Sequence, residues 1–185
     1  MTRPWAHWLQ PLAGITLAAA LVGCEGQSWG LRRAAPTASP LAAEQRLDPS
    51  LSGDGRLLAS IVERNGRSSV LLQEQPSGRM LPLRHLRGHQ PHRSPSLSWN
   101  GRYLALLMHQ GGQSVAVIED RLSGQLLRLP PPGGSSVEAL SLAPDGQALA
   151  LQLVQGGQQR VLVFDLSGLL EPDRPGAQRV SNPRP

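Results

Sequence analysis

The residue types most suited to chemistry gather in one short stretch of the chain. Three histidines lie within eight residues of one another: His85, His89 and His92. Imidazoles at this spacing can meet at a divalent metal ion. No cysteine, aspartate or glutamate occurs between Glu74 and Glu119 to complete such a site locally. The alternative is a solvated connector between two folded units. We therefore favour the connector, keep the three histidines only as weak candidates for metal ligands, and predict no cofactor.

Covalent catalysis has little support in the sequence. Serine is plentiful, yet none occupies the Gly-x-Ser-x-Gly turn that presents a nucleophile in hydrolases. Several carboxylates recur at equivalent places of an internal repeat, which marks them as residues that hydrogen-bond the backbone of turns and strand ends. They are Asp54, Asp145, Glu74, Asp120 and Asp165. We therefore predict a protein that is not an enzyme.

The single cysteine, Cys24, lies directly after a segment with the layout of a secretory signal. Residues 1–8 contain an arginine and no acid, and residues 9–22 are largely apolar. The Leu-Val-Gly-Cys sequence that ends at Cys24 resembles the lipobox of bacterial lipoproteins. The resemblance implies that residues 1–23 are removed and that Cys24 is the site of lipid attachment. An ordinary cleaved signal and an uncleaved anchor are the alternatives, although the apolar run is short for a membrane span and contains Pro11.

A lipid anchor would place the protein at a membrane of the bacterial cell envelope, facing the periplasm. Residues 24–46 are rich in alanine and proline and lack strand periodicity, so we expect a lipidated cysteine followed by a flexible tether. The sequence leaves open whether the inner or the outer membrane carries the anchor.

A nine-residue phrase recurs three times in the sequence, about 45 residues apart. It predicts the structural elements that position the residues discussed above. Its copies are LSGDGRLLA from Leu51, LSWNGRYLA from Leu97 and LAPDGQALA from Leu142. A fixed period of this size is typical of stacked supersecondary units, which bind partners through their surfaces. Each copy places aspartate or asparagine before glycine, the pair favoured in tight turns between strands. These structural turn residues are Asp54, Gly55, Asn100, Gly101, Asp145 and Gly146.

Apolar runs between the turns predict about four short strands in each unit. The run after each turn is almost continuously apolar, which indicates a strand covered on both faces. These runs are 57–62, 103–108 and 148–154, and the next strands are 70–72, 115–118 and 161–164. Innermost strands are expected around 96–98 and 139–142, and outermost strands at 79–83, 125–129 and 178–180.

These units resemble the TolB-type β-propeller repeat, whose usual form combines a Ser-Pro-Asp-Gly turn with a hydrophobic strand and an aspartate-containing strand. The third copy is nearest, with Pro144 before Asp145 and the run Val161–Asp165, whereas Gly53 and Trp99 replace the proline in the other two. The resemblance implies an all-β, partial β-propeller of three four-stranded antiparallel blades over residues 47–181. The expected blades are about 47–84, 95–129 and 137–181. In this family the repeat residues build blades and carry no chemistry.

The departures from the family also matter. TolB itself has a closed ring of six blades and an additional amino-terminal domain, and it resembles a soluble periplasmic protein that binds peptidoglycan-associated lipoprotein. This chain has three repeats. Three blades should expose apolar faces at both ends. One hypothesis is that two chains join head to tail into a six-bladed ring, and the other is an open half-propeller. Trp99 either fills the space between blades or faces a partner.

The net charge of +5 and the pI near 11.1 raise the question of nucleic-acid binding. All 18 basic residues are arginine, and they are scattered over the three repeats rather than gathered in one stripe. Aromatic side chains that could stack on bases are few. We therefore predict no nucleic-acid partner.

The sequence favours a non-enzymatic, membrane-anchored module that binds an envelope protein, a peptide or a cell-wall component. A small-ligand-binding or enzymatic propeller, and a shortened propeller completed by dimerisation, are the alternatives.

Overall fold

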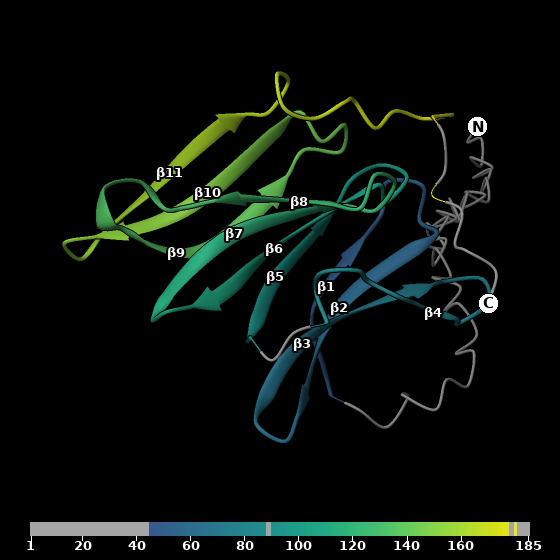
Figure 1. The fold of residues 1–185 in the computed structure, drawn as a ribbon, viewed down its shortest axis with the longest axis horizontal. Helices are drawn as coiled ribbons and strands as arrows, with labels where there is room; N and C mark the ends of the chain where they lie inside the picture. Colours follow the sequence, from purple (N-terminus) through teal and green to yellow (C-terminus); the bar gives the residue numbers. More distant parts are fainter. Residues whose placement is uncertain (1–44, 88–89, 178–179, 181–185) are drawn as a thin grey trace, which may run out of the picture. The chain divides into compact units, whose positions relative to one another are not determined.

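The computed structural model describes residues 45–87, 90–177 and 180, which form three antiparallel sheets (Figure 1). Each sheet is one copy of the repeat and is called a blade below. Blade 1 contains β1 (Arg46–Leu51), β2 (Leu57–Arg64), β3 (Arg67–Glu74) and β4 (Met80–Leu81). Blade 2 contains β5 (His92–Leu97), β6 (Tyr103–Gln110), β7 (Gln113–Asp120) and β8 (Gln125–Leu129). Blade 3 contains β9 (Ser136–Leu142), β10 (Ala148–Gln155) and β11 (Gln158–Asp165). One 3-10 turn, Pro132–Gly134, precedes β9. The prediction of an all-β partial propeller is confirmed.

Blade 3 differs from the expected four-stranded unit. Its described residues form three strands in the order β11-β10-β9, whereas blades 1 and 2 each have four. The fourth strand was expected at 178–180. Residues 178 and 179 lie outside the described part of the chain, and Val180 is not in a strand. The prediction is wrong for Val180. After β11 the chain follows the turn of blade 3, where the Asp173 amide donates to the Asp145 carbonyl, and the Asp173 carboxylate is held by blade 2.

The blades pack on one another through alternating faces of their strands. On β6, Leu104 and Leu106 face blade 1, whereas Ala105 and Leu107 face blade 3, and all four are buried. Successive side chains of a strand point to opposite faces, so the middle blade has an apolar layer on each side. The continuous apolar run of β6 is thus explained. In β10 every second residue is buried, namely its three leucines, because one face of blade 3 packs on blade 2.

Hydrogen bonds between the turns tie each blade to the next. The Asp54 amide donates to the Trp99 carbonyl at 3.0 Å, and the Trp99 amide donates to the Pro144 carbonyl at 2.6 Å. The Trp99 ring lies so close to Gly53 that a Cβ there would be 2.6 Å from a ring carbon. Trp99 therefore fills the space between blades 1 and 2. At Gly101, φ is +67° and the Leu57 side chain occupies the place of a Cβ, so both backbone and packing require glycine.

The part of the chain that the structure describes contains no helix of the length and hydrophobicity needed to cross a bilayer.

Candidate interaction surface

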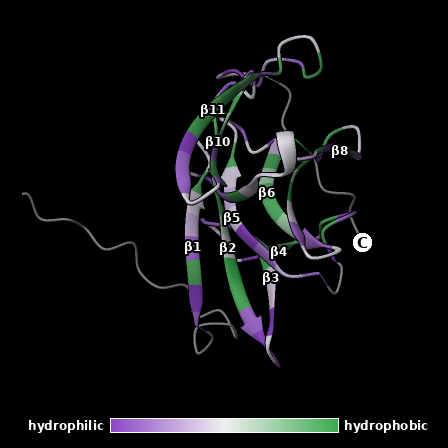
Figure 2. Ribbon diagram, turned by 90° about the vertical axis from the view of Figure 1, so that its left-hand side faces the viewer, coloured by the Kyte–Doolittle hydropathy of each residue, from purple (hydrophilic) through white to green (hydrophobic). Residues whose placement is uncertain are grey.

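The strand β11 is the most unusual feature of blade 3 because its apolar residues face solvent. Val161, Leu162 and Val163 are 67%, 41% and 70% exposed. Their counterparts in the repeat of blade 2, residues 116–118, are at most 1% exposed. Figure 2 shows the apolar part of β11 in green at the end of the sheet. Exposed apolar residues that adjoin one another on a surface mark a binding site.

The outer edge of β11 has no paired strand among the described residues. In blade 2 the equivalent strand, β7, pairs with β8 from Ala116↔Leu129 to Asp120↔Gln125. In blade 1, β3 pairs with the short strand β4. Figure 1 shows β11 at the border of its sheet, with the chain continuing from its end toward blade 2. An edge strand of this kind presents free backbone N–H and C=O groups that another strand can bind.

The third blade also shows an open face. The Ser50 hydroxyl accepts the Leu97 amide of blade 2 at 3.1 Å, and the Ser96 hydroxyl accepts the Leu142 amide of blade 3 at 2.9 Å. Ser141 occupies the same place in the third copy of the repeat and is exposed. The face that would receive a further blade therefore lies open to solvent in blade 3.

The segment after β11 is fixed to blade 2 by a buried carboxylate, Asp173, which sequence reasoning missed. Its Oδ2 accepts the Ser98 hydroxyl at 2.5 Å and the Asn100 amide at 2.8 Å, and its Oδ1 accepts the Asn100 side-chain amide at 2.8 Å. Asp173 is fully buried. In blade 1 the turn contains its own carboxylate, because Asp54 accepts the Ser52 hydroxyl at 2.6 Å. The sequence could have indicated the need for Asp173, because Asn100 of the second copy lacks the carboxylate that Asp54 and Asp145 supply in the other copies.

A second polar cluster joins blade 2 to the same segment. The Arg102 guanidinium donates two hydrogen bonds to Asp120, at 3.3 and 3.1 Å, and one to Glu171 at 2.8 Å. Burial would raise the pKa of Asp120, but the bonds from Arg102 and from nearby backbone amides hold it below the usual value. The Tyr103 hydroxyl donates to the Glu171 carbonyl at 2.8 Å, and burial raises the pKa of this hydroxyl to about 12. These groups border a cleft of about 470 Å³ but are already bonded to one another.

Another cleft, of about 490 Å³, lies at the opposite ends of the strands and includes two residues of the start of β5. The His92 ring is buried, and its Nδ1 accepts the Val70 amide at 3.2 Å. Burial lowers the pKa of His92, so the ring is neutral and links blade 2 to blade 1. Arg93 donates to the Ser114 hydroxyl and to the Val137 carbonyl, both at 3.1 Å. This cleft thus also has polar groups that bond to neighbouring strands.

The other candidate metal ligands have separate positions. His85 Nε2 lies within hydrogen-bonding distance, 2.7 Å, of the Gly124 carbonyl oxygen, and its backbone amide donates to Glu119 at 2.9 Å. His89 lies outside the described residues, as does Cys24. Within the ranges that the structure describes, no three histidine, cysteine or acidic side chains are placed to hold a metal ion. His85 is instead part of the connector that packs on blade 2.

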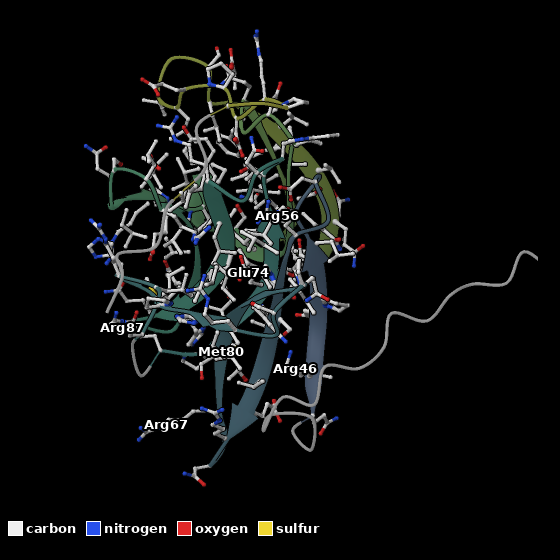
Figure 3. All side chains as sticks on the ribbon, turned by 90° about the vertical axis from the view of Figure 1, so that its right-hand side faces the viewer. Arg46, Arg56, Arg67, Glu74, Met80 and Arg87 are labelled. Atoms are coloured by element: carbon white, nitrogen blue, oxygen red, sulfur yellow. The ribbon has the colours of Figure 1, made fainter. Side chains whose placement is uncertain are left out.

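The arginines of blade 1 are spread over the blade (Figure 3). Arg56 and Glu74 lie near each other, with 3.8 Å between a guanidinium nitrogen and a carboxylate oxygen. Arg46 donates to the Gln73 side chain at 2.6 Å, and Arg67 is at the opposite end of the blade from Arg56. Blade 1 therefore shows no single basic stripe of the kind that follows a nucleic-acid backbone.

Comparison with known proteins shows which fold this arrangement of blades resembles. The sequence matches no family model and no curated protein. Among solved structures, the chain is similar to TolB from Acinetobacter baumannii, with a TM-score of 0.55 and 21% identity over 66% of this chain and 30% of that one. A protein described as TolB from Agrobacterium tumefaciens gives a TM-score of 0.52 and 20% identity over 71% of this chain and 47% of that one. The fold is a TolB-like partial β-propeller.

The TolB-like fold is shared by proteins of more than one kind. A puromycin hydrolase is similar with a TM-score of 0.51 and 18% identity, over 68% of this chain and 19% of that one. The chain spans less than half the length of each TolB structure. At these identities the likeness gives the fold, and the function must come from the surface of this chain.

Proposed function

We propose that this protein is a lipid-anchored component of the bacterial cell envelope whose TolB-like blades bind another macromolecule without catalysing a reaction. The observation that carries the proposal is the exposed apolar run Val161–Val163 on an edge strand. The equivalent runs of the other two blades are covered by a fourth strand and by a neighbouring blade. A surface of this kind is stabilised when a partner supplies the missing contacts.

Two further features support a binding role over an enzymatic one. The polar groups that border the two clefts described above are engaged in hydrogen bonds that join strands or blades: Arg102 donates to Asp120, and the Val70 amide donates to His92. Their pKa shifts have a structural cause. Burial lowers the pKa of His92, and burial would raise that of Asp120 but the bonds from Arg102 and from backbone amides of the same blade hold it down. Groups committed to such joints are poorly placed to bind and transform a substrate.

The proposed location in the cell envelope depends on the signal-like segment 1–23 and on Cys24, which both lie outside the described residues. The TolB-like fold and the bacterial sources of the TolB structures agree with an envelope location facing the periplasm. Metabolic labelling with a palmitate analogue tests the anchor. The wild-type protein should incorporate the label and remain with membranes, whereas Cys24→Ala should lose the label and become soluble. Equal labelling of both proteins would contradict lipid attachment at Cys24.

The binding role is tested by cross-linking the tagged, full-length protein in intact cells and purifying it from a detergent extract. Wild-type protein should bring down one envelope component in near-stoichiometric yield, and that component can be the chain itself. The double variant V161S/V163S removes most of the apolar surface of β11, so it should lose that component. Recovery of nothing from the wild type, or equal recovery from the variant, would contradict the proposal.

A further inference from the structure

We propose that the partner of β11 is β11 of a second copy of this chain. The two strands would pair antiparallel about a two-fold axis, so that two three-stranded blades become one continuous sheet of six strands. This inference rests on the proposed binding role of blade 3 and names its partner.

The repeat itself indicates that the ligand of β11 is a strand. Residues 161–165 are equivalent to residues 116–120, and in blade 2 those five residues pair with β8. The chain's own continuation does not take that place among the described residues. The Leu166 amide donates to the Gln147 carbonyl, and Asp173 is held at the turn of blade 2. Val180 lines a small cleft with residues of blades 1 and 2. Because none of the described residues pairs with this edge, we infer that another chain supplies the strand.

The sequence of β11 is complementary to itself in one register. Residues directly opposite each other on antiparallel strands point to the same face, and a two-fold axis normal to the sheet preserves each face. A residue must therefore lie opposite one of its own face. With Leu162 opposite Leu162 of the partner strand, Val161 lies opposite Val163 and Val163 opposite Val161. The valines of the two chains then contact each other on one face of the sheet, and the two Leu162 side chains contact each other on the opposite face.

The polar residues fit the same register. Arg160 lies opposite Phe164, where a guanidinium can stack on the ring, and Gln159 lies opposite Asp165. No like charges face each other. A shift of two residues in one direction would place Val161 opposite Asp165 and Leu162 opposite Phe164, and a shift in the other direction would place Leu162 opposite Arg160. Both shifts lose the Val161–Val163 pairs and put a charged side chain opposite Val161 or Leu162. On this ground we infer the register in which Leu162 lies opposite Leu162.

The head-to-tail ring expected from the sequence needs a different contact, in which the open face of blade 3 covers the outer face of blade 1. That face of blade 1 presents Leu51 to solvent, but Ser60 and Val62 in its middle are buried. The two faces are therefore not both open, whereas the β11 edge is open in each copy. Anchoring on one membrane would raise the local concentration of the chains and favour pairing through a single strand.

Disulfide trapping in the full-length chain tests the register. In the proposed pair the two Leu162 Cα atoms lie directly opposite, about 4.5–5.5 Å apart, within the range that a disulfide spans. The variant Leu162→Cys should form a covalent dimer under mild oxidation. The control Arg160→Cys should not, because its two sulfurs would be four residues out of register, about 13 Å along the strands. The parent chain, with Cys24 alone, gives the baseline.

A pair of charge variants provides a second test that needs no disulfide. In V161K/V163E each lysine lies opposite a glutamate of the partner strand, whereas in V161K/V163K lysine faces lysine. Both variants remove the same apolar surface from the same positions, so circular dichroism should show both folded alike. Size-exclusion chromatography with light scattering of the detergent-solubilised protein should show at least ten times more dimer for the Lys/Glu variant.

The outcomes separate this inference from the proposed function. Dimer from Leu162→Cys but not from Arg160→Cys, with the expected order of the charge variants, supports β11 self-pairing. No disulfide dimer, together with capture of a different envelope protein that is lost in V161S/V163S, overturns self-pairing and leaves the binding role standing. Absence of any partner at β11 overturns both. Equal dimerisation of the two charge variants also overturns self-pairing through this register.

Discussion

Removal of the Asp173 carboxylate should destabilise the protein far more than its position in a loop-like segment would suggest. In Asp173→Ala, four donors of blade 2 lose a bond to this carboxylate: the Ser98 hydroxyl, the backbone and side-chain amides of Asn100 and, at 3.4 Å, the Arg102 amide. Ser98 and Asn100 are buried. Each unsatisfied buried donor costs about 1–3 kcal/mol, and loss of one member of a buried charged network costs about 3–5 kcal/mol. We expect a loss of about 3–5 kcal/mol.

Urea unfolding followed by circular dichroism measures this loss as a change in midpoint. The control is Glu171→Ala, two residues away, because its carboxylate is 78% exposed and makes only a surface ion pair with Arg102. That change should cost at most about 1 kcal/mol. A total stability of about 5–15 kcal/mol is usual for a domain, so the first variant should unfold at clearly lower urea and remain measurable.

The repeat suggests a compensating change for the same variant. In blade 1 the carboxylate belongs to the turn itself, because Asp54 accepts the Ser52 hydroxyl and the Arg56 amide. Asn100→Asp would give blade 2 the same internal acceptor, so in the Asp173→Ala background it should recover about 1–2 kcal/mol. In the wild-type background it should destabilise, because two carboxylates would face each other. Equal losses from Asp173→Ala and Glu171→Ala, or no difference between the two backgrounds, would refute this account of the turn.

Three further predictions concern the joints between blades. Gly101→Ala should cost about 1–3 kcal/mol more than Gly55→Ala in chemical denaturation, because both glycines have positive φ but only Gly101 is packed against Leu57; equal costs would contradict the close approach. Tyr103 is the only tyrosine, so its ultraviolet titration should show a pKa near 12, and stability should fall as pH rises from about 10, the unfolded value, through 12; an ordinary pKa would argue against burial. Asp120 has a lowered pKa, so it stabilises the fold above its unfolded value of about 3.9 and this contribution is lost as pH falls through the lower folded value. Asp120→Asn should therefore be less stable at neutral pH and lose less on acidification in thermal melts, and parallel pH curves would count against it.

The sequence was sufficient for the blades because the same local signals occur three times. Turn pairs such as Asp54-Gly55 and apolar runs such as that of β6 depend on neighbouring residues, so their periodicity predicts strands directly. The exposure of β11 could not be read this way. Its Val-Leu-Val-Phe run has the composition of a buried strand, and only the arrangement of the sheets shows that none of the described blades or strands covers it.

Two other features depend on long-range contacts. The fourth strand expected at 178–180 rests on repeat spacing alone, and Val180 departs from it because Asp173 is held at the turn of blade 2 by contacts between residues about 73 positions apart. The histidines are close in sequence, yet His85 bonds to Glu119 and to the turn after β7, whereas His92 accepts the Val70 amide of β3. The local sequence pattern does not reveal which distant residue a single polar side chain will bond. Those distant bonds determine where the connecting segments between and after the blades lie.

The central claim is that the protein works by binding through β11. A photo-reactive amino acid placed at Val163 in the full-length protein, with a control at Leu169, tests it in intact cells. The two side chains are similarly exposed, at 70% and 64%, but Leu169 lies beyond the end of the strand. The account predicts an adduct of one discrete mass from Val163 and little or none from Leu169. No adduct from Val163, or the same products from both positions, would contradict it.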